Sequence, residues 1–157
     1  MKLGSQTIII LNEIQTGVDR LGVPTYEYTS TTVNGCSVQE HGTSRTISLT
    51  DVSTARSRLF APSTAPLTTT SRVGVTDSSF LGSVSSQAAM LALTGPVESW
   101  CIRTDLGTSF YLTETPATSL SSWLRTPLYR ADGYPAVWQS ASGRNSHIEC
   151  FLQRQEG

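Results

Sequence analysis

The sequence is poor in charged residues and has no long apolar run. Only 15% of its 157 residues are charged, and the formal net charge is -1 at a pI near 6.1. Proteins that bind DNA through its phosphates carry a basic excess, so sequence-specific DNA binding is not expected. The apolar run near the N-terminus, Ile8–Leu11, is far shorter than the ~20 residues that span a bilayer. We therefore expect neither export through an N-terminal signal nor a membrane-embedded segment.

The sequence also lacks the patterns of metal, thiol and hydrolytic chemistry. Cys36, Cys101 and Cys150 cannot all pair within one chain, and their spacing fits no zinc site, so we expect reduced thiols. The only histidines, His41 and His147, lie in no catalytic motif and are expected to have surface or hydrogen-bonded structural roles. The acidic residues are scattered, and the glycine patterns of nucleotide sites are absent. We expect no enzyme, no cofactor and no metal.

Serine and threonine, by contrast, make up more than a quarter of the chain. Together with few charges, this composition favours strands and polar turns over charged amphipathic helices. The predicted fold is all-β, or β-dominated, in one domain that spans residues 1–157. At this length a single hydrophobic core is the default.

The organising stretch is Thr7–Gln39, which predicts two long strands joined by a polar turn at Asp19–Pro24. Later stretches add strand signals, including an extended Leu67–Val75 and a strand that runs from Trp123 into a turn at Asp132–Gly133. Phe60 and Trp138 are predicted as core aromatics. The predicted small β-barrel consists of Thr7–Leu11, Thr25–Gln39, Val52–Ala61, Leu128–Arg130 and His147–Arg154. In its last strand, Ile148, Cys150 and Leu152 share one face, and His147, Glu149, Phe151 and Gln153 share the other.

Residues 77–122 have a different pattern and are predicted to form a long insertion with a small core of its own. Ser83–Leu93, followed by Gly95 and Pro96, has the start and stop signals of one short helix. Glu98–Thr104 and Thr108–Glu114 flank Asp105–Gly107 and predict a hairpin. Placed at a surface loop, such a segment costs the main fold little loop-closure entropy.

One polar loop is the candidate site. A loop of this length in a compact barrel is uncommon unless it is functional or mobile, although a solvated loop with a short edge strand remains an alternative. It is expected to face a neighbouring ring or a channel, and it comprises Glu40, His41, Gly42, Thr43, Ser44, Arg45, Thr46, Ile47, Ser48, Leu49 and Thr50.

Several blocks at the two ends of the chain carry a family resemblance. They are Gly17–Tyr26, Val33–Gln39, Ser57–Pro62, Tyr129–Trp138 and His147–Cys150. With these blocks, Thr7–Val75 and Trp123–Gly157 resemble the head-to-tail stopper (head-tail joining) proteins of siphophages, especially those that infect actinobacteria. The 77–122 segment is longer than the short link expected at that place in the family.

The resemblance implies a structural virion protein of the phage neck, made in the host cytoplasm. It implies a homo-oligomeric ring, commonly a hexamer, between the portal-adaptor complex and the tail terminator. Packaged DNA would lie in the lumen without sequence-specific contacts. Two alternatives remain open: a tail terminator or tail-tube protein of the same virion, and a β-sandwich ligand-binding module, which the composition equally allows.

Overall fold

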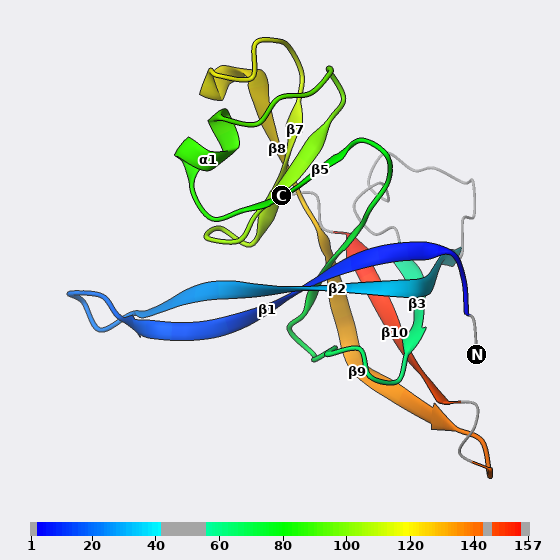
Figure 1. Cartoon of the computed structure of the whole chain (residues 1–157). Helices are drawn as coiled ribbons and strands as arrows, with labels where there is room; N and C mark the ends of the chain where they lie inside the picture. The colour runs from blue at the N-terminus through cyan, green and yellow to red at the C-terminus, as the bar shows by residue number, and fades with distance from the viewer. Residues whose placement is uncertain (1–2, 42–55, 143–145, 155–157) are drawn as a thin grey trace, which may run out of the picture. The chain divides into compact units, whose positions relative to one another are not determined.

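The computed structural model describes residues 3–41, 56–142 and 146–154. Within them, strands dominate and the only α-helix is short, so the predicted β-dominated class is confirmed (Figure 1). The elements are β1 (Gln6–Val18), β2 (Pro24–His41), β3 (Arg56–Pro62), β4 (Arg72–Val75), β5 (Phe80–Val84), α1 (Gln87–Leu91), β6 (Trp100–Arg103), β7 (Thr108–Leu112), η1 (Leu120–Ser122), β8 (Trp123–Thr126), β9 (Tyr129–Gln139) and β10 (Ser146–Arg154).

The predicted long hairpin is present as β1 and β2, and a compact turn fixes its register. The Oδ1 atom of Asp19 accepts hydrogen bonds from the backbone N–H groups of Leu21 and Val23, at 2.8 and 2.9 Å. Gly22 follows with a φ of 79°, a conformation that glycine adopts at no steric cost. An aspartate that bonds its own backbone and a glycine two residues later explain why this segment turns and does not extend.

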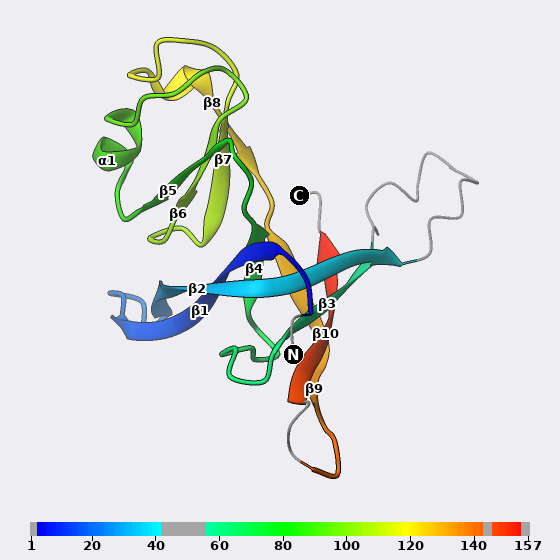
Figure 2. The same cartoon turned by 45° about the vertical axis from the view of Figure 1, so that its right-hand side comes forward.

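Six strands form one ring-like sheet in the order β1-β2-β3-β10-β9-β4, which closes on itself. β10 lies between β3 and β9 and is antiparallel to both, as the adjacent ribbons in Figures 1 and 2 show. The ring closes between β4 and β1, where the backbone N–H and the hydroxyl of Thr76 both donate to the Thr7 carbonyl at 2.9 Å. The strands predicted for the barrel all contribute to this sheet, although residues 52–55 of the third lie outside the described part.

The inner face of this ring-like sheet holds a hydrophobic core. Strand alternation directs every second side chain of β3 and β10 inward, so Leu59, Ala61, Ile148, Cys150 and Leu152 meet there, and the predicted faces of the last strand are confirmed. The other buried members are Ile8, Ile10, Cys36, Ala65 and Val73. Each fully buried Leu or Ile contributes roughly 1.5–3 kcal/mol relative to exposure.

The chain divides into two compact units. The first contains residues 1–10, 31–76 and 128–157, and therefore most of the ring-like sheet. The second contains residues 11–30 and 77–127 and has a four-stranded sheet in the order β5-β6-β7-β8. Its core is separate and consists of Met90, Cys101, Phe110, Leu112, Ala117 and Trp123.

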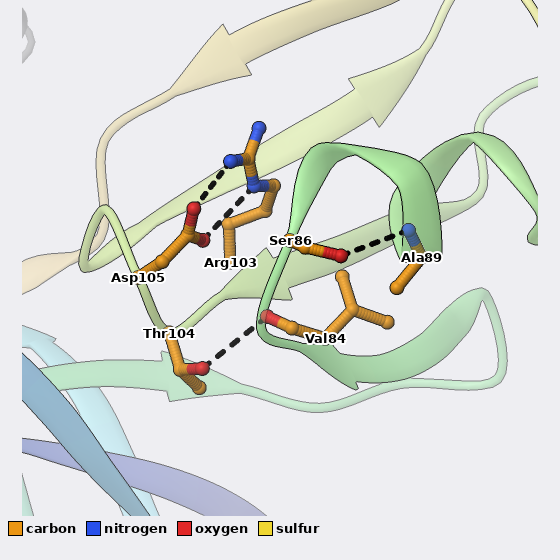
Figure 3. A network of polar contacts seen from close by, with 6 residues as sticks. All are labelled: Val84, Ser86, Ala89, Arg103, Thr104 and Asp105. Atoms are coloured by element: carbon orange, nitrogen blue, oxygen red, sulfur yellow. Dashed lines mark hydrogen bonds and ion pairs between the residues drawn. The ribbon is translucent and has the colours of Figure 1, made fainter.

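The hairpin predicted in the second unit is confirmed as β6 and β7. Gly107 lies in its turn with a φ of 64°, and the register pairs Trp100 with Tyr111 and Cys101 with Phe110. The guanidinium of the buried Arg103 forms an ion pair with Asp105 of the turn (Figure 3). It also lies 5.7 Å from the centroid of the Phe110 ring. The turn is therefore tied to the strand that precedes it.

The predicted short helix is present as α1, which covers fewer residues than the predicted Ser83–Leu93. Ser83 and Val84 belong to β5, which pairs in parallel with Ile102 and Arg103 of β6, so the helix cannot begin before Ser86. The Ser86 side chain caps it by accepting the Ala89 N–H at 3.1 Å (Figure 3). A parallel pair needs a crossover connection, and the short helix α1 lies in that crossover. Sheet pairing thus overrides the helix propensity of the serine and alanine run.

The turn predicted at Asp132–Gly133 is wrong, because both residues lie inside the continuous strand β9. The partner of Glu149 is Ala136, whereas the partner of Phe151 is Asp132, so three residues of β9 oppose a single residue of β10. Gly133 has a φ of 87° at this bulge. The positive φ that suits glycine to a turn here serves a β-bulge, which bends the strand without reversing it.

We predict that Gly133→Ala destabilises the protein by about 1–2 kcal/mol, the cost of forcing a side chain into the left-handed region. No atom lies within 4 Å of the added Cβ, so the cost comes from the backbone alone. The control is Gly17→Ala in β1, where the added Cβ would meet the Thr25 hydroxyl at an ordinary 3.7 Å. Urea unfolding should separate the two variants. Equal stabilities would contradict the assignment of strain to the bulge.

Candidate functional site

The loop predicted as the functional site lies almost wholly outside the described residues. Glu40 and His41 are the last two residues of β2, where their backbones pair with Ser57 and Arg56 of β3. Gly42–Thr50 fall in the part of the chain that is not described, so their role stays a prediction. The described strands that flank this loop in the sequence are β2 and β3, and β3 pairs with β10.

The outer face of these strands carries a cluster that we call the arginine-aromatic face. Because directly paired residues of antiparallel strands project to the same side, the register places its members together. They are Arg56, Arg58 and Phe60 of β3, His147, Glu149 and Phe151 of β10, and Asp132 of β9.

Glu149 is at the centre of the polar contacts of this face. His147 donates from Nε2 to Oε1 of Glu149 at 2.9 Å, and the Arg58 guanidinium forms an ion pair with the other oxygen. These contacts, the His147 hydrogen bond foremost, hold the pKa of Glu149 below its ordinary value of 4.5 despite the opposing effect of burial. The carboxylate therefore stays ionised and fixes the side chains on both sides of it.

The aromatic rings are held by the arginines. The Arg56 guanidinium lies 4.4 Å from the Phe151 ring centroid, and that of Arg58 lies 5.1 Å from the Phe60 centroid. Arg56 also forms a 3.1 Å ion pair with Asp132. Two nitrogens of this face, Arg58 Nε and His147 Nδ1, are buried without a hydrogen-bond partner. Arginine and aromatic side chains are enriched at protein interfaces, and this arrangement offers both in fixed positions.

A row of arginines crosses the same face of the sheet, and it begins at Arg56, two residues before Arg58 in β3. Arg56 faces Gln153, Gln153 faces Arg130, and Arg130 faces Arg72 of β4. Direct cross-strand pairing of two arginines is unfavourable because like charges repel. The three arginines Arg56, Arg130 and Arg72 form what we call the arginine row.

Two predicted core aromatics lie elsewhere than expected. Trp138 faces His147 across the β9–β10 pair and is 55% exposed, and Phe60 lies half-buried on the outer face. Both predictions are wrong. The alternation of β3 directs Ser57, Leu59 and Ala61 inward and Phe60 outward, and the pairing of Trp138 with His147 places it on the same outer face. The core tryptophan is Trp123 of the second unit, whose Nε1 donates to the Ala117 carbonyl at 2.8 Å.

A second notable surface is the end of the β1–β2 hairpin, which we call the hairpin arm and define as residues 13–27. Every residue of the hairpin arm is exposed. Its charges are Glu13, Asp19 and Glu27 against the single Arg20. Its large apolar side chains, from 47% to 88% exposed, are Ile14, Val18, Leu21, Val23 and Tyr26. Exposed apolar groups gathered on one element mark an interaction surface more often than a solvated one.

The three cysteines are buried and unpaired. Burial raises the pKa of both Cys36 and Cys101 to about 11 and raises that of Cys150 as well. Thiols of this kind are protonated at neutral pH and are poor nucleophiles and metal ligands.

Across the described residues, no three His, Cys, Asp or Glu side chains lie close enough together to hold a metal ion. Nor does that part of the chain contain a helix long and apolar enough to cross a membrane.

Comparisons with known protein families, with curated proteins and with solved structures give no match.

Sequence reasoning missed the arginine-aromatic face, although its signal was present. Arg56, Arg58 and Phe60 alternate with Ser57, Leu59 and Ala61, and this period of two predicts one polar and one buried face. The same alternation was read correctly in β10. Which arginines would share a row could not be predicted, because the row depends on pairings between strands far apart in the sequence.

We predict that Glu149→Gln destabilises the protein at neutral pH and that the difference shrinks in acid. A carboxylate whose pKa is lowered in the folded state contributes stability above its unfolded pKa, and this contribution is lost as the pH falls through the folded pKa. The gap in unfolding free energy between wild type and variant should therefore be full above about pH 5 and narrow below pH 4.5.

Urea unfolding between pH 3 and pH 7 measures the gap, and an NMR titration of the Glu149 carboxyl carbon measures its pKa directly. Glu114→Gln, at an exposed position of the second unit, controls for the loss of one carboxylate from the chain. A gap for Glu149→Gln that is constant with pH would contradict the role of its ionised form.

Proposed function

We propose that this chain is a structural protein of the phage virion neck, of the head-to-tail stopper type. Copies form a ring, of six subunits by the family resemblance, between the portal-adaptor complex and the tail terminator. The ring joins the DNA-filled capsid to the tail and helps to retain packaged DNA, which lies in the lumen without sequence-specific contacts. The role is structural and not catalytic.

The observation that carries this proposal is the hairpin arm. A two-stranded ribbon is at best marginally stable in water unless further strands or another surface cover it. This arm nevertheless exposes five large apolar side chains along 15 residues. Such an element is costly for a monomer and is explained by assembly, in which a neighbouring chain covers it.

The ring-like sheet supports the same proposal. The resemblance implies a small β-barrel protomer. The sheet of β1, β2, β3, β10, β9 and β4 is closed, and it contains residues of each block that carries the resemblance. Positive and negative side chains are nearly balanced over the chain, with 11 against 12. A nearly neutral ring lets DNA slide, since each phosphate neutralised adds about 0.9 to the slope of affinity against salt on logarithmic axes.

We predict that the purified protein forms a discrete ring. Native mass spectrometry should give one oligomer whose mass is an integral multiple of 16.9 kDa, and negative-stain images should show a ring with a central channel. A monomer at every concentration would contradict the proposal and favour a ligand-binding module. The position of the chain in an electron-microscopy map of virions separates a stopper from a tail terminator, because the terminator lies on the tail side.

A further inference from the structure

The four-stranded sheet of the second unit has an apolar row on the face opposite its core. Directly paired residues project to the same side of a sheet, so the register aligns Phe80 of β5, Trp100 of β6, Tyr111 of β7 and Leu124 of β8. The core residues Cys101 and Trp123 alternate with these positions and project to the other face. We call these four residues the apolar row. It ends at Leu124, which is 57% exposed.

The outer edge of β8 is open. Within the described parts of the chain, only β7 pairs with this strand. Unpaired edges are templates for strands of other chains, and proteins commonly block them with bulges or prolines. At the opposite edge, β5 has an irregular register between Phe80 and Ser83, with Gly82 at a φ of 116°. β8 has neither device within Trp123–Thr126, so its edge is the better template for a further strand.

Arg125 restricts which strand can join this edge. Its side chain is exposed and forms no ion pair with any residue that the structure describes. A charged residue on an edge discourages pairing with most strands. A strand that sets a carboxylate beside Arg125 and an apolar side chain beside Leu124 gains a favourable cross-strand pair on each face. The matching strand therefore has an acidic and an apolar residue side by side.

β1 has this sequence in the hairpin arm, where it forms a two-stranded ribbon with β2 (Figure 1). Glu13 and Ile14 are adjacent and exposed, and Ile14 is 49% exposed. β1 contains no proline, whereas β2 begins with Pro24, which has no N–H to donate to a partner strand. The arm therefore offers β1 as the edge that fits β8.

The charges also determine the direction of pairing. With Ile14 opposite Leu124, an antiparallel pair sets Glu13 opposite Arg125. A parallel pair would set the uncharged Gln15 there. The antiparallel arrangement thus satisfies both faces of the sheet at once, because it pairs the two charges on one face and extends the apolar row by Ile14 on the other.

From this match we infer that β1 of one copy adds to the β8 edge of the next copy, with Ile14 beside Leu124 and Glu13 beside Arg125. The inference rests on the proposed ring and specifies its contact. Because two different surfaces meet, the contact is heterologous, and contacts of this type generate closed rings when the rotation between copies closes. Main-chain hydrogen bonds add affinity to such a strand addition, and the side-chain pairs make it specific.

Cysteine crosslinking tests the pairing. In a chain with both Ile14→Cys and Leu124→Cys, a short bismaleimide should join neighbouring copies into a ladder on denaturing gels. The control chain has Val18→Cys with Leu124→Cys, and it should crosslink several times less because Val18 lies about 13 Å further along β1. The native cysteines are buried and add little background. Mixing the single variants Ile14→Cys and Leu124→Cys should give crosslinked dimers, which shows that the crosslink joins two chains.

An exchange of charges gives a second readout. Arg125→Glu should raise the dissociation constant of the oligomer tenfold or more, because two carboxylates then meet at the contact. Adding Glu13→Arg to the same chain should restore assembly, since every arm then meets an edge of opposite charge. Glu114→Arg, at an exposed position outside β1 and β8, makes the same change of charge and should not restore it. Sedimentation velocity measures assembly in each case.

The outcomes separate this contact from the proposed function. Equal crosslinking in the test and control chains, or a loss of assembly that Glu13→Arg does not restore, would overturn the contact while the ring stands. Crosslinked dimers from Ile14→Cys alone would overturn it in favour of pairing between two arms. A wild-type chain that stays monomeric would overturn both the contact and the proposed function.

Discussion

The fold of the first unit depends on the position of β10 between β3 and β9. One face of this strand places Ile148, Cys150 and Leu152 in the core, and the other places His147, Glu149 and Phe151 in the arginine-aromatic face. A slip of one residue would exchange the two faces, burying a carboxylate and a histidine and exposing the apolar side chains. The cost of an unpaired buried charge makes that alternative inaccessible. The register of β10 that places apolar side chains in the core therefore also places the charged and aromatic side chains together on the outer face.

Much of the fold could be predicted from local signals. The β1–β2 turn could be predicted because Asp19 supplies a side-chain acceptor and Gly22 supplies a positive φ, and the two residues lie within four positions of each other. The β6–β7 hairpin and the alternation of β10 followed in the same way. The predicted start of the short helix did not, because Ser83 pairs with Ile102 and belongs to β5. A local propensity is worth a few tenths of a kcal/mol per residue, less than a strand pairing and its burial.

The bulge in β9 could not be predicted from the local sequence. Asp-Gly has the conformational freedom for a turn and for a bulge alike, and the dipeptide does not distinguish the two. The pairing with the opposite strand decides between them, because three residues of β9 oppose the single residue Cys150 between Glu149 and Phe151. The strand then continues to Gln139 and carries Trp138 to an exposed position, although a tryptophan is more often buried. The candidate loop was predicted from length and polarity alone, and its central residues lie outside the described part.

The hairpin arm is the feature of this chain that stability alone does not explain. Every residue of the arm is exposed, and five large apolar side chains lie along it, an arrangement that costs free energy in the isolated chain. A two-stranded ribbon in water gains little stability from its own pairing, so the arm is not retained for the sake of the fold. Its three carboxylates against one arginine give it an acidic excess, which disfavours pairing between the arms of two copies. The apolar side chains would supply affinity for a covering surface, and the charges would restrict which surface can cover the arm.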